Sequence, residues 1–184
     1  MSVTQQLNTI PLKRADGSTT NLADYAGKVV LVVNVASKCG FTPQYEALEK
    51  MYEDKQAAGL VVLGFPTGNF AQQEFDTDAE IATFCSTTYG VSFPVLSKIS
   101  VAGSDQHPLY SGLTQAVPEA QGLEEFREMM KKYKMELPPA PAVLWNFEKF
   151  LLDRHGKVVA RFSPHIAPDD ARLAAAIEAE LAKS

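Results

Sequence analysis

Lys28-Val-Val-Leu-Val-Val-Asn-Val-Ala-Ser-Lys-Cys39-Gly-Phe-Thr-Pro43 is the stretch that decides the fold. Six residues from Val29 to Val35 are Val or Leu without alternation, which predicts a strand buried on both faces of an α/β sheet. The chain then becomes polar, and Pro43 suits the first position of a helix that Thr42 can cap. A buried strand therefore leads directly into a helix, and Cys39 lies at the junction.

The position of Cys39 favours a reactive thiol. Unpaired backbone N–H groups and the positive end of the helix dipole stabilise an anion there, and Lys38 adds a positive charge. The thiolate is the nucleophilic form of cysteine. The alternative is a small buried apolar residue, because free cysteines are among the most buried residue types. Position alone leaves both interpretations open.

Length and composition indicate one ordinary globular domain covering residues 1–184, with 46% hydrophobic and 21% charged residues. The net charge of −5 gives no electrostatic support for nucleic-acid binding. No apolar stretch approaches the length of a membrane span, and the first residues lack the features of a secretory signal. We therefore expect no membrane insertion and a cytoplasmic location, where a disulfide is more often transient and catalytic than structural.

A metal site is not expected. The chain has two cysteines and three histidines, and none of them shows the short spacings of zinc ligands. His107, His155 and His165 lie in segments rich in Pro, Gly and charge, which favours solvated loop residues.

The segments after the first strand predict a parallel crossover. A helix is expected over about 43–58, ended by Gly59, and a second buried strand over 60–65. Functional groups collect at the carboxyl ends of such parallel strands. Cys39 and the loop at 66–70 should therefore be neighbours.

The remaining elements follow from local patterns of apolar residues, turn residues and caps. We expect a hairpin at 14–18, a helical turn over 21–27, a helix over 78–89 and an extended segment over 91–100. Residues 117–141 form an excursion with a charged amphipathic helix over 124–133. Strands over 144–152 and 158–162 and a final helix over 169–182 complete the chain.

Four blocks resemble the glutathione peroxidase family of the non-selenium, cysteine type, within the thioredoxin-fold superfamily. They are 34–42, 63–66 with Gln73-Glu74, 84–89 followed by Phe93-Pro94, and 145–150, and they occur in the family's order over most of the chain. The resemblance implies a thioredoxin-like α/β fold with a central mixed sheet flanked by helices. With the local signals above, we expect this fold to carry an N-terminal hairpin extension and a helical insertion near 117–141, within one peroxidase domain over 1–184.

By this resemblance, Cys39 attacks the O–O bond of hydrogen peroxide or an organic or lipid hydroperoxide and becomes a sulfenic acid. Trp145 and Asn146 match two family residues that supply neutral N–H donors to the sulfur or the peroxide. Asn69 stands where the family has a functional Gln, so the same amide lies on a side chain one methylene shorter. We expect the Asn69 contact to sulfur to be longer or water-mediated, and turnover to be lower.

Cys85 matches the block in which thioredoxin-dependent members carry the resolving cysteine. The resemblance therefore implies a Cys39–Cys85 disulfide, reduced by thioredoxin or glutathione as the external thiol, without a bound cofactor. Thr67 stands where a competing cysteine is usual. The alternative for Cys85 is a buried apolar position on its helix.

Three other functions remain open at this point. A thioredoxin-type disulfide reductase is disfavoured because the chain has no CxxC motif, and a peroxiredoxin is disfavoured by the Trp145-Asn146-Phe147 block. The third is a thiol redox sensor or binding protein, in which oxidation of Cys39 changes a surface without efficient turnover. Antioxidant defence through peroxide reduction is the leading hypothesis.

Overall fold

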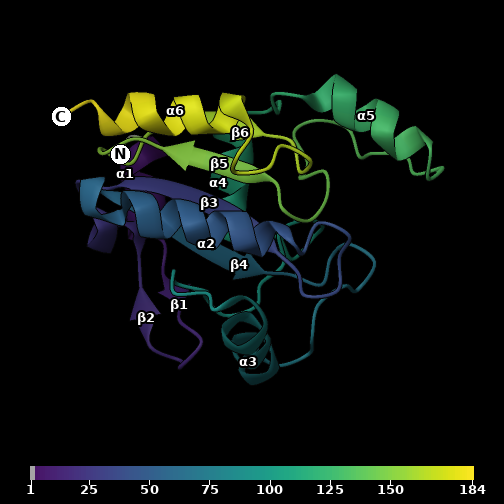
Figure 1. Cartoon of the computed structure of the whole chain (residues 1–184), viewed down its shortest axis with the longest axis horizontal. Coiled ribbons are helices and arrows are strands. Elements are labelled where there is room, and N and C mark those ends of the chain that lie inside the picture. The colour runs from purple at the N-terminus through teal and green to yellow at the C-terminus, as the bar shows by residue number, and fades with distance from the viewer. Residues whose placement is uncertain (1–2) are drawn as a thin grey trace.

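The computed structural model describes residues 3–184, and a mixed sheet of four strands forms its centre (Figure 1). The strand order is β4 (Leu60–Pro66), β3 (Val29–Val35), β5 (Lys149–Leu152) and β6 (Val158–Phe162). Strands β3 and β4 are parallel, whereas β3–β5 and β5–β6 are antiparallel. The predicted parallel crossover and the central mixed sheet are confirmed.

Six α-helices lie among the described residues, together with a short N-terminal hairpin of β1 (Leu12–Lys13) and β2 (Thr19–Thr20). The helices are α1 (Val3–Thr9), α2 (Gln44–Lys55), α3 (Asp78–Tyr89), α4 (Pro108–Ala116), α5 (Leu123–Lys131) and α6 (Ala171–Leu181). Short 3-10 turns cover Leu22–Tyr25 and Gln56–Ala58. The helix at 43–58 thus ends in a 3-10 turn, and Gly59, with φ 113°, stops it as predicted.

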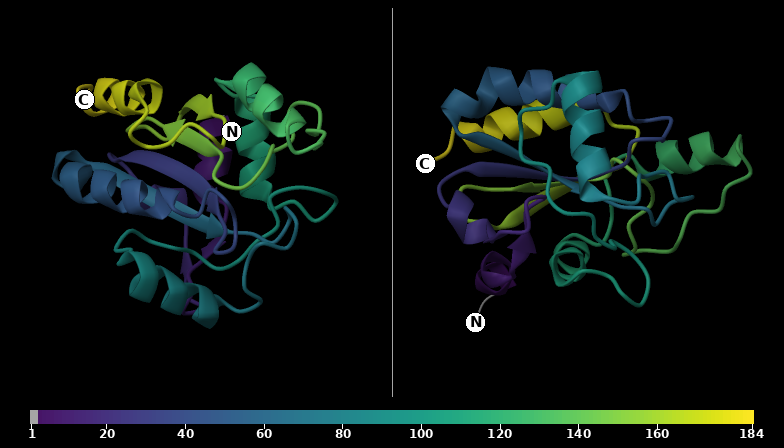
Figure 2. Two further views of the ribbon diagram at one scale, coloured as in Figure 1. Left: turned by 45° about the vertical axis from the view of Figure 1, so that its right-hand side comes forward. Right: turned by 90° about the horizontal axis from the view of Figure 1, so that it is seen from below.

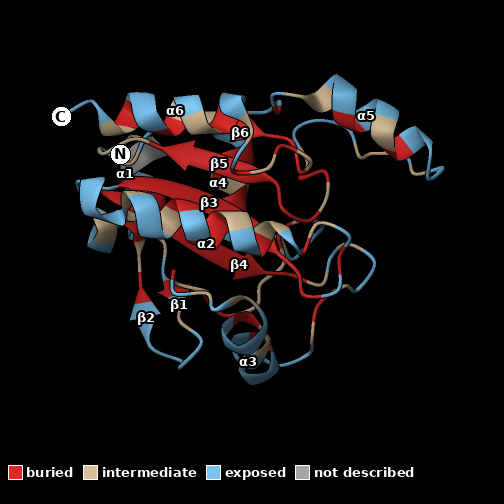
Figure 3. Cartoon of the chain, viewed as in Figure 1, coloured by how far each residue is buried: buried red, intermediate tan, exposed pale blue. Residues whose placement is uncertain are grey.

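Alternate residues of β3 face two different cores, because successive side chains of a strand point to opposite faces. Leu31 and Val33 join the cluster formed by α2, α3 and α6, whereas Val30 and Val32 join the cluster formed by α1 and α4. Figure 2 shows α2 and α6 on one side of the strands and α1 and α4 on the other. Both faces of β3 are covered, which explains its unbroken apolar run (Figure 3).

The excursion is present as α5 and its flanking loops, and α5 projects from the body of the domain (Figure 1). Its buried face, centred on Phe126 and Met130, packs on Leu144 and contacts Phe41 and Trp145. His165, which we expected to be solvated, has a side chain only 10% exposed. It stacks on Phe126 and its Nε2 lies 3.2 Å from Glu125 Oε2, so that expectation is wrong.

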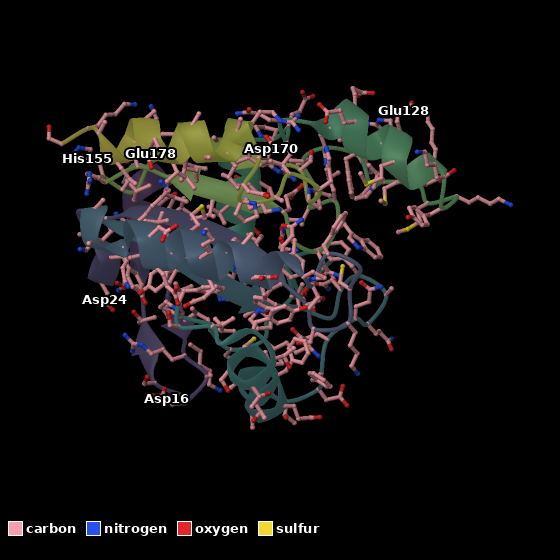
Figure 4. The ribbon with its side chains drawn as sticks, viewed as in Figure 1. Asp16, Asp24, Glu128, His155, Asp170 and Glu178 are labelled. Atoms are coloured by element: carbon pink, nitrogen blue, oxygen red, sulfur yellow. The ribbon has the colours of Figure 1, made fainter. Side chains whose placement is uncertain are left out.

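Acidic residues on the outside of this region face solvent. Figure 4 labels Glu128 on α5 and Asp170, which lies at the start of α6 and caps it. The Arg172 guanidinium bridges Asp170 and Glu125 at 2.9 and 2.7 Å. The excursion is therefore tied to α6 by ion pairs at the surface as well as by its apolar face.

Three segments differ from the sequence-based expectations. Helix α4 was not predicted; His107 caps it, its ring Nδ1 accepting from the Leu109 amide at 3.1 Å. Residues 91–100 form only isolated bridges, such as Gly64 to Val95, in place of a regular strand. The segment 144–148 is a loop, because Phe147 has φ 67° and its amide turns to bond Asn34 O at 2.6 Å. Strand β5 consequently begins at Lys149.

In residues 3–184, no helix combines the length and the apolar character that crossing a lipid bilayer would require.

Candidate active site

Cys39 lies in a tight turn between β3 and α2. Its side chain is buried, with 8% exposed, and the backbone N–H of Phe41 donates to Cys39 Sγ at 3.3 Å. The Thr42 hydroxyl accepts from the Cys39 amide at 2.9 Å and donates to Ala36 O at 2.7 Å. The predicted cap by Thr42 is therefore wrong: this side chain braces the cysteine turn, and Pro43 is the N-cap of α2.

This turn presents a hydrogen-bond donor to the sulfur at the start of a helix. The Phe41 N–H points at the sulfur, and α2 begins a few residues later at Gln44, so both direct positive partial charge toward the side of the turn that carries Cys39. Lys38 is exposed, and its ammonium lies 4.5 Å from the centre of the Phe75 ring. The charge of Lys38 is thus directed over the neighbouring loop.

The Trp145–Asn146 loop is fastened to β3 beside this turn. Asn34 Nδ2 donates to Trp145 O at 3.0 Å, and Asn34 O accepts from the Phe147 amide. Asn34 is fully buried within an apolar strand, where an amide side chain needs partners. The Trp145 ring packs against the core cluster that contains Cys39, and it lies 5.4 Å from the Phe70 ring. Both predicted donors are therefore held at the cysteine end of β3.

Asn69 faces the adjacent loop. Its Oδ1 accepts from Thr67 Oγ1 at 2.6 Å and from the Val101 amide at 2.7 Å. Its Nδ2 donates to Ser100 Oγ at 3.2 Å. The residue is exposed, and these bonds join the loop after β4 to the segment around residue 100.

Gln73 connects the two halves of the site. Its backbone oxygen accepts from the Lys38 amide at 2.8 Å, one residue before the cysteine. Its side-chain Oε1 accepts from Asn146 Nδ2 at 3.0 Å. Asn146 is completely buried. A single residue thus bonds both the cysteine turn and the loop that carries the predicted donors.

Cys85 faces inward from α3 and is only 3% exposed. Burial raises the pKa of the Cys85 thiol; the nearby Tyr45 hydroxyl on α2 opposes this shift, and the charge of Glu74 adds to it. Cys85 and Cys39 belong to the same core cluster, and both are free thiols. These surroundings favour the protonated form of Cys85 in the folded protein.

Glu74 is a buried carboxyl group next to Gln73. Its Oε1 accepts from the Ser37 amide at 3.2 Å and the Phe75 amide at 2.9 Å. Burial raises the pKa of Glu74, while the hydrogen bonds from Ser37 and Phe75 and the charge of Lys98 oppose the shift. Glu74 therefore anchors the loop at 71–75 to the chain just before Cys39.

Sequence reasoning assigned no role to Asn34 or Gln73. For Asn34 a signal was present, because one amide inside an otherwise apolar buried strand must find hydrogen bonds. For Gln73 the signal was weaker. It belongs to one of the four sequence blocks, and because Asn69 stands where the family has Gln, a second amide near Cys39 had to be considered.

The geometry defines a class of protein first. A central mixed sheet with helices on both faces, and a cysteine between the first core strand and the next helix, describe a thioredoxin-like fold. The model of the family described as glutathione peroxidase matches residues 7–114.

Known relatives extend this match over nearly the whole chain. The thioredoxin/glutathione peroxidase BtuE of Escherichia coli K12 is 48% identical over 95% of this chain and 97% of its own. The hydroperoxy fatty acid reductase gpx1 of Synechocystis is 45% identical over 89% of this chain and 88% of its own. The crystal structure of Trgpx in apo form, 35% identical, superposes with a TM-score of 0.68 over 95% of both chains.

The chain belongs to the glutathione peroxidase family, as a cysteine-containing member, and is an enzyme of the peroxidase class. The resemblance of the four sequence blocks is thereby confirmed, and so is the thioredoxin-like fold.

Proposed function

We propose that the protein reduces hydrogen peroxide and organic or lipid hydroperoxides through Cys39, and that it serves oxidative stress defence. The observation that carries this proposal is the Cys39 turn, where the Phe41 N–H meets the sulfur at 3.3 Å beside the Trp145–Asn146 loop. The named activity of the Synechocystis relative on hydroperoxy fatty acids supports organic substrates.

The first step is a displacement at oxygen. The Cys39 thiolate attacks one peroxide oxygen, an S–O bond forms, and the O–O bond breaks. The leaving hydroxide or alkoxide takes a proton and departs as water or an alcohol, and Cys39 becomes a sulfenic acid. Trp145 and Asn146 supply neutral N–H donors that stabilise the charge that moves from sulfur to oxygen.

The second step forms a disulfide. Cys85 attacks the sulfur of the Cys39 sulfenic acid, an S–S bond forms, and water leaves with the thiol proton. Cys85 is buried on α3, so if its sulfur starts too far from Cys39 for a disulfide, α3 has to unwind locally before the thiol can attack. Gly90, in a left-handed conformation at the end of α3, is a natural point for that opening.

The disulfide is then reduced by an external thiol, thioredoxin or glutathione. The presence of Cys85 favours thioredoxin, and the name of the Escherichia coli relative, thioredoxin/glutathione peroxidase, includes both reductants. The cycle uses cysteine side chains and the external thiol, so it requires neither a bound cofactor nor a metal. A transient disulfide of this kind suits a reducing compartment, and we propose a cytoplasmic location.

Mass spectrometry and steady-state kinetics together test this function. One equivalent of peroxide should give a Cys39–Cys85 disulfide in the wild type, and Cys39→Ser should not react. Cys85→Ser should still lose one thiol to peroxide but should stop turning over with thioredoxin, its reductase and NADPH. The same assay with glutathione identifies the preferred reductant.

Two results would count against the proposal. Persistent sulfenic acid with two unlinked cysteines in the wild type would remove the role of Cys85. Consumption of a single equivalent of peroxide with either reductant would instead indicate a redox sensor.

A further inference from the structure

The change from Gln to Asn at position 69 leaves open which amide serves the site. The Asn69 side chain makes its three hydrogen bonds to Thr67, Ser100 and Val101. These bonds use its Oδ1 twice and its Nδ2 once. The Asn69 amide thus joins the loop after β4 to the segment at Ser100 and Val101.

Gln73 has the opposite arrangement. It is half-buried, and it reaches the Lys38 amide with its backbone oxygen and Asn146 Nδ2 with its side-chain oxygen. Of the two amides, Gln73 is the one that hydrogen-bonds a predicted donor of the site. The contact joins residues that lie far apart in the sequence.

We propose that Gln73 is the positioning residue of the peroxidase site and that it orients the Asn146 amide for the chemistry of Cys39. The inference rests on the proposed function of Cys39 and concerns how this chain holds its amide donor.

The chemistry of the Asn146 amide makes this orientation important. The group has two N–H donors on one end and an oxygen acceptor on the other, and rotation by 180° exchanges them. Gln73 Oε1 accepts one N–H, so the nitrogen end of the Asn146 amide faces Gln73, the residue whose backbone oxygen bonds the Lys38 amide next to Cys39. We infer that the second N–H of Asn146 serves the sulfur or the peroxide. Asn146 Oδ1 is buried without a partner among residues 3–184, so no other bond of this side chain selects the orientation.

Without the Gln73 acceptor, the Asn146 amide can present its oxygen to an anionic sulfur. An oxygen there would repel the thiolate and the developing alkoxide, and the N–H donor would be lost. Misplacing a donor by about 1 Å lowers rates by about 100-fold in other enzymes. We expect loss of the acceptor to lower the rate of Cys39 oxidation by about 10- to 100-fold.

Three variants isolate the acceptor. Gln73→Met keeps the length of the side chain and removes the acceptor, whereas Gln73→Glu keeps an oxygen acceptor. Gln72→Met is the matched control, because Gln72 is an exposed neighbour of the same type. The measurement is the second-order rate of Cys39 oxidation by hydrogen peroxide without reductant, followed by the fluorescence of Trp145, the single tryptophan of the chain.

Rates are compared at their high-pH plateau, because the charge of Gln73→Glu would otherwise disfavour the thiolate. We expect Gln73→Met to be slower by at least about 10-fold, with Gln73→Glu and Gln72→Met within about threefold of wild type. Circular dichroism establishes folding. Should Gln73→Met not fold, Gln73→Asn, too short to reach Asn146, replaces it in the comparison with Gln73→Glu.

The inference is overturned if Gln73→Met stays within about threefold of wild type, or if Gln73→Glu is as slow as Gln73→Met. It is also overturned if Asn69→Ala lowers the rate as strongly as Gln73→Met does. A wild-type protein whose Cys39 does not react with peroxide would contradict the proposed function itself, so the two failures are distinguishable.

Discussion

Replacing Arg161 by methionine should destabilise the fold by about 3–5 kcal/mol, because a buried ion pair and a hub of hydrogen bonds are lost together. The Arg161 side chain is 1% exposed, and its Nη2 lies 2.9 Å from Oε2 of the fully buried Glu148. The guanidinium also lies over the Phe150 ring, 4.9 Å from its centre.

The hydrogen bonds of Arg161 account for most of this magnitude. Besides Glu148, its two terminal nitrogens donate at 2.9–3.0 Å to four backbone oxygens, those of Val117, Pro118, Pro141 and Ala142. These acceptors lie at both ends of the excursion, so Arg161 connects the two ends to each other and to β6. Each net hydrogen bond contributes about 1 kcal/mol, and the orphaned carbonyls add their desolvation.

The charge of Glu148 contributes less than a fully ionised carboxylate would. Burial raises the pKa of Glu148 to about 7, and the Arg161 charge only partly opposes the shift. In Arg161→Met the carboxyl group keeps its proton, which avoids a stranded charge. The expected loss of about 3–5 kcal/mol therefore comes mainly from the lost hydrogen bonds and the four unpaired carbonyl oxygens.

Urea unfolding and thermal melting measure the effect. A loss of about 3–5 kcal/mol corresponds to a melting temperature lower by about 6–20 °C in a domain of this size. Arg172→Met serves as the control, since Arg172 makes its ion pairs at the surface and should change stability far less. The double variant Arg161→Met/Glu148→Leu should recover only part of the loss, because the four carbonyls stay unpaired.

A loss in Arg161→Met no larger than that in Arg172→Met would refute this reasoning. Full recovery in the double variant would show that the ion pair alone matters, and the assignment of Arg161 as the closure of the excursion would then be wrong.

Two further predictions concern Thr42 and Glu148. Thr42→Val keeps the shape of the side chain but removes the hydrogen-bond partner of the Cys39 amide and of the Ala36 carbonyl. The free energy of unfolding in urea should fall by about 1–3 kcal/mol, and peroxide should oxidise Cys39 more slowly. Unchanged stability would contradict the bracing role of Thr42. Burial raises the pKa of Glu148 from 4.5 to about 7, so the folded protein binds this proton more tightly than the unfolded chain does. The stability that this protonation contributes is fully present below pH 4.5 and is lost as the pH rises through 7. Glu148→Gln should therefore lose less stability than the wild type between pH 5 and pH 8, and equal losses in urea midpoints would argue against it.

Much of the fold could be predicted because its elements are encoded locally. The apolar run of β3, the Thr77 cap and the Gly90 stop of α3 are signals within a few residues of each other. Helix α4 was missed because its apolar positions lie in a short segment between Gly and Pro residues. The segment 144–148 was taken as strand because its apolar and aromatic residues have strand propensity, whereas the bond to Asn34 turns it.

The active site was predicted less completely than the fold. Cys39, Trp145, Asn146 and Cys85 were named from the sequence blocks, and the structure holds the first three at one end of β3. The hydrogen-bond partners of these side chains could not be predicted from any one block. The contact of Gln73 with Asn146, for example, depends on how two loops pack.

The sequence by itself determined that a buried strand ends in a cysteine before a helix, and that four blocks belong to one peroxidase family. Hydrophobic periodicity, caps and turn residues act over short distances, so they can be recognised along the chain. Only the tertiary structure decided that Thr42 braces the cysteine turn, that Asn69 faces another loop and that Gln73 holds Asn146. The physical reason is that the direction of a polar side chain depends on partners brought near by packing, and a short amide has several partners within reach.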